Sequence, residues 1–341
     1  MKIKNNNNKY CLLDKLNIFK NHDQDKKVFL IINNPYIGDI LLINSLVQNI
    51  KHIYPNSIVV MLTTSNLADV AKYQYGVDDV IIWDRIDMHN NLLETIKFIK
   101  NFPYKKIFAA FPIYTRERSV YLSLLLNSKY ILFYKQNKRF SIPNLLLRTK
   151  YKIKCNGTTM QEYHASLLTG ITKEKLENKP ILYNVTNNDL IKDYRDTYIS
   201  LCCTSTRTIK DMPFEVVCQV IETLKDYKII LLGSGQLASE LSEKLKTKYF
   251  SNLVDLTNKT TILETVNYIN NSVGMVSVDT GLMHFACALK TPVVCVFYET
   301  NKSSYMPNPL IYKAVIVNKE NAKNYKNIIS ALSTLEIAKS H

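Results

Sequence analysis

The sequence predicts an α/β protein in which two doubly wound parallel-sheet domains face a central cleft. The chain has 341 residues, and at about 100–200 residues per domain this length predicts two domains. Hydrophobic residues make up 46% of the chain, which is enough to build real cores. From Lys27 onward, short apolar runs rich in β-branched residues alternate with amphipathic stretches, which is typical of βαβ units in a parallel sheet.

The first domain is expected at residues 27–175, after a polar lead at residues 1–26 that is rich in Asn and Lys. Its longest predicted helix, at 38–53, has Ile40, Ile43, Val47 and Ile50 at helical spacing, and Pro55 ends it. The segment 137–158 interrupts the alternation, because it mixes Lys and Arg with apolar side chains. Strands are expected at 28–32, 58–62, 79–83, 106–110 and 130–134, with further helices at 90–100, 115–126 and 161–169.

The second domain is expected at residues 191–321, after a polar linker at 176–190 that contains Pro180. The same alternation restarts there, and a helix within residues 322–341 closes the chain. Strands are predicted at 198–203, 228–232, 253–256, 274–278, 293–297 and 314–317, and helices at 214–225, 236–246, 262–271 and 282–289. Open α/β sheets bind ligands outside the carboxyl ends of their strands, so the facing cleft is the expected site of chemistry.

The apolar runs, the N-terminal lead and the cysteines together indicate a cytoplasmic protein. We find no apolar run that approaches the roughly 18–20 residues of a membrane-spanning helix. The N-terminal lead is too broken by polar residues to be a signal peptide. The seven cysteines have no CxxC spacing, so neither a zinc site nor a disulfide framework is expected.

The net charge of +15 is concentrated in one stretch. Residues 97–154 contain fourteen Lys or Arg and a single acid, Glu117. A basic surface there would attract nucleic acid, anionic lipid headgroups or a phosphorylated glycolipid. A solvated face with no partner remains the alternative interpretation.

The most specific motif joins a buried strand to a helix through Asp279-Thr280-Gly281 and continues to His284. The unpaired N–H groups and positive dipole end of such a helix form an anion site, and Gly281 lets backbone approach closely. Thr280 and His284 lie four residues apart and so share a helix face. The alternative is structural, with Asp279 and Thr280 as capping residues and His284 as a surface histidine.

A second motif, Thr204-Ser-Thr-Arg-Thr-Ile-Lys210, follows the predicted strand at 198–203 and precedes Pro213 and a helix. Hydroxyl groups and a lysine at the carboxyl end of a strand can bind a diphosphate by hydrogen bonds and charge. Lys210 is the candidate phosphate ligand, and a solvated lysine is the alternative.

A third motif, Ile37-Gly38-Asp39, lies between the first strand and the first helix. An Asp there is commonly a helix cap. Its functional interpretation is a carboxylate that accepts a proton from a substrate hydroxyl.

Together the three motifs resemble glycosyltransferase family 9, the heptosyltransferases. Lys210-x-Met-Pro213 stands where the family usually has Lys-x-Trp-Pro, and Asp279-Thr-Gly-Leu-Met-His284 is the most specific part of the likeness, which extends from about residue 27 to the closing helix. The resemblance implies a GT-B architecture, an acceptor held by the first domain, a sugar nucleotide held by the second, inversion at the anomeric carbon and no metal or other cofactor. The donor is expected to be ADP-heptose, or another nucleotide sugar, and the acceptor a lipopolysaccharide or lipooligosaccharide core.

The resemblance also implies roles for individual residues. Asp39 would be the general base that deprotonates the acceptor hydroxyl. The diphosphate leaving group would be bound by Lys210, Thr280 and Gly281, with Asp279, His284, Ser205 and Thr206 as further donor-site residues. Gln236 stands where the family often has an acid for the nucleotide ribose, and Pro35-Tyr36 replaces small polar residues near the acceptor pocket.

An anionic glycolipid acceptor gives the basic stretch a partner. Lys135, Lys138 and Arg139, interspersed with apolar residues, are expected to contact the acceptor or the inner face of the inner membrane peripherally. Two competing functions are disfavoured. This sequence lacks the G-x-G-x-x-G turn that a dehydrogenase needs, and apart from its charge it has no motif of a nucleic-acid-binding protein. Asp23-Gln-Asp25 matches the pattern of metal-dependent glycosyltransferases but lies in the polar lead, where a solvated pair is expected.

Overall fold

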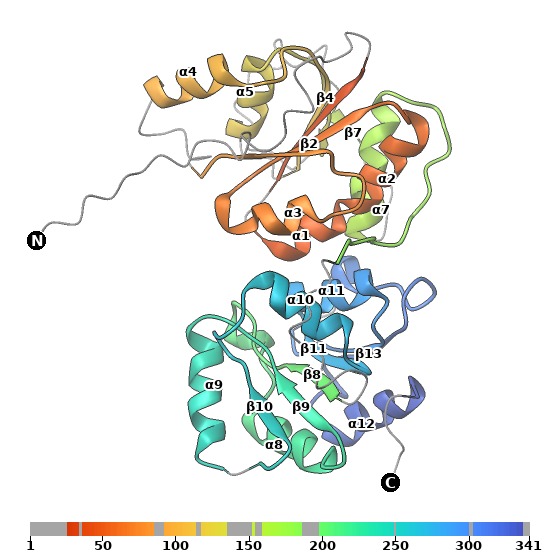
Figure 1. The fold of residues 1–341 in the computed structure, drawn as a ribbon. Helices are drawn as coiled ribbons and strands as arrows, with labels where there is room; N and C mark the ends of the chain where they lie inside the picture. Colours follow the sequence, from red (N-terminus) through yellow and green to blue (C-terminus); the bar gives the residue numbers. More distant parts are fainter. Residues whose placement is uncertain are drawn as a thin grey trace, which may run out of the picture.

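The protein folds into two lobes, each built on a parallel sheet (Figure 1). The computed structural model describes residues 26–33, 36–84, 92–113, 117–134, 152–153, 159–185, 198–248, 250–299 and 303–336. The first lobe contains the sheet of order β3-β2-β1-β4-β5, and the second contains the sheet of order β10-β9-β8-β11-β12-β13. The predicted pair of doubly wound parallel sheets is therefore confirmed.

The first sheet is buried on both faces, because its strands are nearly continuous apolar runs. Phe29 and Ile31 of β1 pack on one face with α1 and α2, whereas Leu30 and Ile32 pack on the other with residues of α4 and α5. The strands are β1 (Val28–Ile32), β2 (Ile58–Thr63), β3 (Asp79–Ile82), β4 (Ile107–Pro112) and β5 (Ser128–Ile131); the helices are α1 (Ile37–Leu42), α2 (Asn44–Ile53), α3 (Ala68–Lys72), α4 (Leu92–Asn101), α5 (Glu117–Leu125) and α7 (Met160–Ser166).

Three elements of the first lobe differ from the sequence prediction. The helix expected at 38–53 is divided into α1 and α2 at Ile43, whose carbonyl accepts from both Leu46 N and Val47 N. The strand expected at 130–134 is shared between β5 and the short β6 (Phe133–Tyr134), which pairs with β7 (Lys152–Ile153). The helix α3 was not predicted, because five residues are too few to show helical periodicity.

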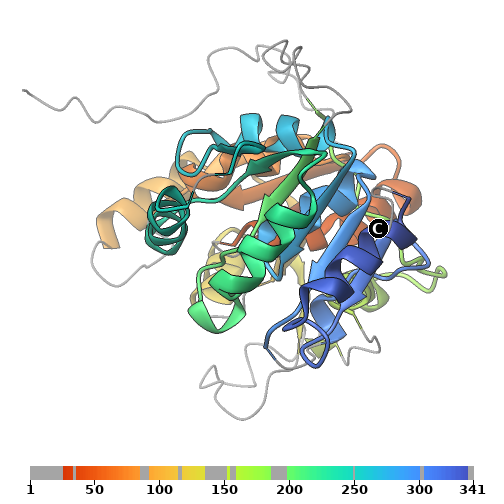
Figure 2. The same ribbon diagram turned by 90° about the horizontal axis from the view of Figure 1, so that it is seen from below.

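The second lobe follows the predicted alternation closely. Its strands are β8 (Tyr198–Cys202), β9 (Lys228–Leu231), β10 (Leu253–Asp255), β11 (Gly274–Val278), β12 (Val293–Val296) and β13 (Ala314–Val317); its helices are α8 (Phe214–Thr223), α9 (Gln236–Lys246), α10 (Ile262–Asn270), α11 (Gly281–Leu289) and α12 (Tyr325–Thr334). The helices α8 and α12 lie side by side on the outer face of the sheet (Figure 2). The helices α10 and α11 cover the other face and lie next to the first lobe (Figure 1).

The two lobes share one buried apolar core. The helices α1 and α3 of the first lobe pack against α11 and α10 of the second. Part of the predicted linker lies in this contact: Ile181 N donates to the Tyr312 hydroxyl at 3.0 Å, and the Tyr183 ring lies edge-on to Phe285 at 5.0 Å. These contacts set how the two sheets face one another.

Candidate active site between the two lobes

The three sequence motifs all lie at points where the winding of a sheet reverses. In the first sheet the reversal falls between β1 and β4, and in the second it falls between β8 and β11. The Gly38-Asp39 turn follows β1, the loop ending at Lys210 follows β8, and the Asp279-Thr280-Gly281 turn follows β11. Crevices at such positions bind the ligands of open α/β sheets.

The first turns of α1 and α11 interlock through their glycines. A Cβ atom on Gly281 would lie 2.8 Å from Ile37 Cβ, and one on Gly38 would lie 3.0 Å from His284 Cδ2. Real Cβ atoms essentially never approach as closely as the Gly281 distance, so this position needs glycine for the lobes to meet as they do; a Cβ on Gly38 would require the His284 ring to shift by a few tenths of an ångström. The structure thus gives Gly281 a packing role, and its contact with a diphosphate stays a prediction.

Thr280 is a capping residue, as one interpretation of the sequence expects, whereas Asp39 is not. Tyr36 is the N-cap of α1, so Asp39 lies inside the first turn and is not the capping residue. Thr280 is the N-cap of α11, but its hydroxyl makes no capping hydrogen bond to this described helix. The first N–H groups of α11 therefore lack the usual side-chain cap, which suits a helix end that receives an anion.

His284 is buried beneath the α1 turn rather than exposed on the surface. Only 4% of the residue is accessible, and burial lowers the pKa of its imidazole to about 4; the nearby Asp279 carboxylate raises it and Lys210 lowers it further. The ring is neutral at pH 7 as a result. The interpretation of His284 as a surface histidine is wrong, because α11 directs this position toward the first lobe.

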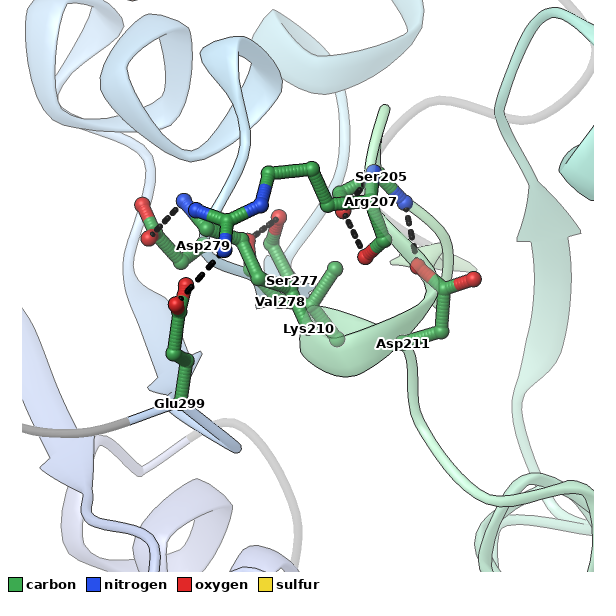
Figure 3. A network of polar contacts seen from close by, with 8 residues as sticks. All are labelled: Ser205, Arg207, Lys210, Asp211, Ser277, Val278, Asp279 and Glu299. Atoms are coloured by element: carbon green, nitrogen blue, oxygen red, sulfur yellow. Dashed lines mark hydrogen bonds and ion pairs between the residues drawn. The ribbon is translucent and has the colours of Figure 1, made fainter.

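Lys210 and Asp279, both predicted to serve the donor site, form an ion pair. Lys210 Nζ lies 2.5 Å from Asp279 Oδ2, and both side chains are partly buried (Figure 3). Lys210 ends the 3₁₀ helix η5 (Thr208–Lys210), and Asp279 follows β11. A carboxylate repels a diphosphate, so Asp279 is suited to orienting the lysine rather than to touching phosphate oxygens itself.

The loop after β8 is held by its own polar groups (Figure 3). Ser205 N donates to Asp211 Oδ1 at 2.7 Å, and the Ser205 hydroxyl donates to Arg207 O at 2.9 Å. Burial raises the pKa of Asp211, although the Ser205 hydrogen bonds oppose this. Thr206 is exposed. The Ser205 hydroxyl already has a local partner, and Thr206 is accessible to a ligand.

Two groups near the site were not found from the sequence. Arg207 Nη2 binds Glu299 Oε1 at 2.7 Å and so connects the loops after β8 and β12 (Figure 3). Tyr305, in the 3₁₀ helix η6 (Ser303–Tyr305), has its pKa raised by burial and by the charges of Asp39 and Asp279. Arg207 lies within the second sequence motif but was not singled out there, and Tyr305 belongs to no recognisable motif, so only the folded chain shows what these side chains contact.

Gln236, the predicted contact of the nucleotide ribose, lies at the start of a helix in the second lobe. Gln236 is the exposed first residue of α9, and its side-chain amide donates to Glu240 Oε1 at 3.0 Å. It follows β9, the neighbour of β8, at the same edge of the sheet as the Lys210 loop.

The other residues singled out in the sequence lie outside the described residues: Lys135, Lys138, Arg139, Pro35 and the Asp23-Gln-Asp25 pattern. Among the described residues, no three His, Cys, Asp or Glu side chains are grouped so that they could hold a metal ion.

Solved structures with a similar fold include several glycosyltransferases. The chain superposes on the crystal structure of the glycosyl transferase family 9 from Veillonella parvula DSM 2008 with a TM-score of 0.77, 16% identity and coverage of 91% of this chain and 97% of that chain. For the E. coli ADP-heptose lps heptosyltransferase II, the TM-score is 0.70, with 19% identity and coverage of 91% and 98%. For E. coli heptosyltransferase WaaC with ADP, it is 0.71, with 16% identity and coverage of 90% and 99%. These likenesses establish the GT-B fold.

Sequence comparison identifies the family. A segment of 94 residues is 33% identical to the lipooligosaccharide heptosyltransferase 2 of Haemophilus influenzae, and this match spans 27% of each chain. The family described as glycosyltransferase family 9 (heptosyltransferase) matches residues 118–332, which is more than half of the chain and includes the Lys210 and Asp279 motifs. With the fold and the order of the motifs, this match shows that the chain belongs to glycosyltransferase family 9.

Proposed function

We propose that this protein is an inverting, metal-independent glycosyltransferase that moves a sugar from a nucleotide donor to a hydroxyl of a lipopolysaccharide or lipooligosaccharide core. ADP-heptose is the proposed donor, and no cofactor is required. The observation that supports this most directly is the interlock of Gly38 with His284, since it brings the turn that carries Asp39 against the turn that carries Asp279. Membership of the family supports the same activity.

In this mechanism Asp39 acts as the general base. Its carboxylate takes the proton of the acceptor hydroxyl while the hydroxyl oxygen attacks the anomeric carbon of the donor. The bond between that carbon and the diphosphate oxygen breaks at the same time, and the nucleoside diphosphate leaves with the bonding electrons. Attack from the face opposite the leaving group inverts the anomeric configuration.

The second lobe stabilises the leaving group. Lys210 supplies a cation that Asp279 orients, and α11 supplies backbone N–H groups at its first turn. A helix end contributes only about 0.3–2 kcal/mol, so the lysine and the Thr206 and Thr280 hydroxyls must add to it. His284 remains neutral at pH 7, so it does not add a second positive charge beside Lys210 for binding the diphosphate.

Peripheral contact with the cytoplasmic leaflet belongs to the same proposal. The helix α4 has an outward face on which Leu93, with 71% of the residue exposed, and Ile96 lie beside the exposed Lys97 and Lys100. Apolar side chains flanked by lysines suit the interface of an anionic membrane. Lys135, Lys138 and Arg139, which lie outside the described residues, are proposed to contact the membrane or the acceptor.

The decisive experiment measures nucleoside diphosphate release from a panel of sugar nucleotides, with and without core glycolipid. We expect acceptor-dependent release from ADP-heptose. Asp39→Asn should lose about 100-fold or more of the turnover, the lower range for a general base, while it keeps the donor affinity. Lys246→Ala is the matched control, because its ion pair with Glu243 lies exposed on α9. Full turnover in Asp39→Asn would remove the assigned base, and no release from any donor would refute the proposed activity.

A further inference from the structure

Two buried polar side chains at one edge of the first sheet have no hydrogen-bond partner among the described residues. Asn33 is 3% exposed, and neither its amide nitrogen nor its amide oxygen is bonded. Thr63 is 1% exposed, and its hydroxyl is equally unpartnered. Each unsatisfied buried group costs about 1–3 kcal/mol, so its retention in a native protein calls for an explanation such as a catalytic role, an ordered water or a bound ligand.

The strand register brings these two side chains to the same place. Ile32 pairs with Leu62 in the parallel ladder, and Asn33 N continues it by donating to Leu62 O at 3.1 Å. Asn33 is therefore opposite Thr63. Alternate residues of a strand point to the same face, so Asn33 shares the face of Phe29 and Ile31, and Thr63 shares the face of Val59 and Met61, all of which lie in one core.

Their position is at the carboxyl edge of the sheet, where a ligand is expected. Asn33 follows β1 at the reversal between β1 and β4, and it precedes Asp39 by six residues. Along the chain, only the connection from β1 to the first turn of α1 lies between Asn33 and the proposed general base. The first lobe is the acceptor lobe in the proposed function, so this edge lies on the acceptor side.

The chemistry of the two groups restricts what they bind. An amide both donates and accepts, and a hydroxyl does the same. Neither group can neutralise a phosphate or a carboxylate, but together they match the adjacent hydroxyls of a sugar ring. An uncharged, hydroxyl-bearing sugar unit is the ligand that satisfies all three unpaired atoms.

We infer that Asn33 and Thr63 form an acceptor subsite that hydrogen-bonds neutral sugar hydroxyls next to the hydroxyl that Asp39 deprotonates. This inference rests on the proposed function. It assigns the anionic groups of the acceptor to other surfaces, such as the lysines of α4, and it gives Asn33 and Thr63 a role in acceptor binding rather than in folding.

The test uses apolar replacements of similar size. Asn33→Leu and Thr63→Val remove groups that are unpaired in the free protein, so neither should lower the melting temperature. Each should raise the acceptor KM by about 3- to 10-fold, the effect of one to two hydrogen bonds, with the donor KM unchanged. The probe pair is ADP-heptose with core glycolipid, and nucleoside diphosphate release is the readout.

Asn49→Leu provides the matched control. Asn49 is buried on α2, but its amide donates to Ser45 O at 2.7 Å and to Glu177 O at 2.8 Å, and it accepts from Glu177 N at 3.1 Å. Asn49→Leu should lower the melting temperature without changing the acceptor KM of the folded enzyme. The contrast between the two buried asparagines separates a binding role from a structural one.

Three outcomes decide the matter. A raised acceptor KM at unchanged melting temperature, in either Asn33→Leu or Thr63→Val, supports the subsite. An unchanged acceptor KM in every variant that folds, or a loss of stability like that of Asn49→Leu in both variants, overturns it while the wild type remains an active transferase. The wild type is assayed before any variant. If it transfers no sugar, the proposed function itself is refuted, and this outcome is distinct from failure of the subsite. If Asn33→Leu does not fold, Thr63→Val decides alone.

Discussion

Gly38 of α1 and His284 of α11 meet across the contact between the lobes, where a Cβ atom on Gly38 would lie 3.0 Å from His284 Cδ2. The two residues come from opposite walls of the proposed active site. Their contact means that the residue before the proposed base packs against the helix whose N-terminus is the proposed diphosphate site. In the proposed mechanism, the position of the base and the position of the diphosphate are therefore linked through one packed contact.

Gly38→Ala should destabilise the protein. Alanine in a helix gains about 0.5–1 kcal/mol over glycine, but a methyl group forced into a packed contact costs about 1–3 kcal/mol. The steric cost should prevail, because the buried imidazole has little room to move. Denaturant unfolding of Gly38→Ala, His284→Ala and the double variant measures this. The double variant should lose less than the sum of the two single losses, and strict additivity would contradict the contact.

Lys210→Ala should weaken the binding of ADP by about 10- to 100-fold, which corresponds to a charged hydrogen bond of about 1.5–3 kcal/mol. Asp279→Asn should weaken it less, because the lysine charge remains and only its ion-pair partner changes. Titration calorimetry with ADP measures both affinities. Lys246→Ala, which removes an exposed lysine on α9, should bind ADP as the wild type does. Wild-type affinity in Lys210→Ala would rule out the assigned phosphate ligand.

Acid should destabilise the protein partly through His284. Burial lowers the imidazole pKa from 6.5 to about 4, so between these values the unfolded chain binds a proton that the folded chain does not. Stability is therefore present above pH 6.5 and is lost as the pH falls toward 4, by up to about 3 kcal/mol for this group. His164, which is also buried, has its pKa lowered to about 4 and acts in the same direction.

The measurement compares the free energy of unfolding of the wild type with that of His284→Gln across this pH range. Carboxylates titrate in both proteins, so their contribution cancels in the difference. The difference should shrink as the pH falls, since only the wild type loses the histidine contribution. A difference that stays constant from pH 7 to about 4 would show that His284 does not have a depressed pKa.

The outward face of α4 should contribute to membrane binding. Lys97→Glu with Lys100→Glu reverses two charges, and each basic residue near an anionic surface is worth about 1 kcal/mol. Pelleting with vesicles that contain an anionic lipid should show at least tenfold weaker binding, and Leu93→Ser should weaken it further. Lys323→Glu, an exposed lysine of the second lobe, is the charge control. Equal binding by all the proteins would refute this surface.

Much of the fold could be predicted because strands and helices follow local patterns. The bounds of β1, β11, β13 and α9 match their predicted ranges, since apolar runs and amphipathic spacing are properties of neighbouring residues. The break at Ile43 and the short α3 were not predictable, because Ile43 continues the apolar spacing of its neighbours and five residues are too few to show periodicity. Candidate site residues were found where they follow strands in recognisable turns. Tyr305 and Glu299 belong to none of the three motifs, and the ion pair of Arg207 joins residues far apart in the chain.

The amino-acid sequence by itself determined the two parallel-sheet lobes and the order of the three turns, because short-range hydrophobic patterns and backbone preferences are enough to specify both. Only the tertiary structure decided that Lys210 pairs with Asp279, that His284 is buried and neutral, and that the side chains of Asn33 and Thr63 have no hydrogen-bond partner within the described part of the chain. These properties depend on burial and on distances between residues far apart in the chain. The charge state of a side chain and the strength of its hydrogen bonds depend on the groups packed around it, and a local sequence pattern does not specify those groups.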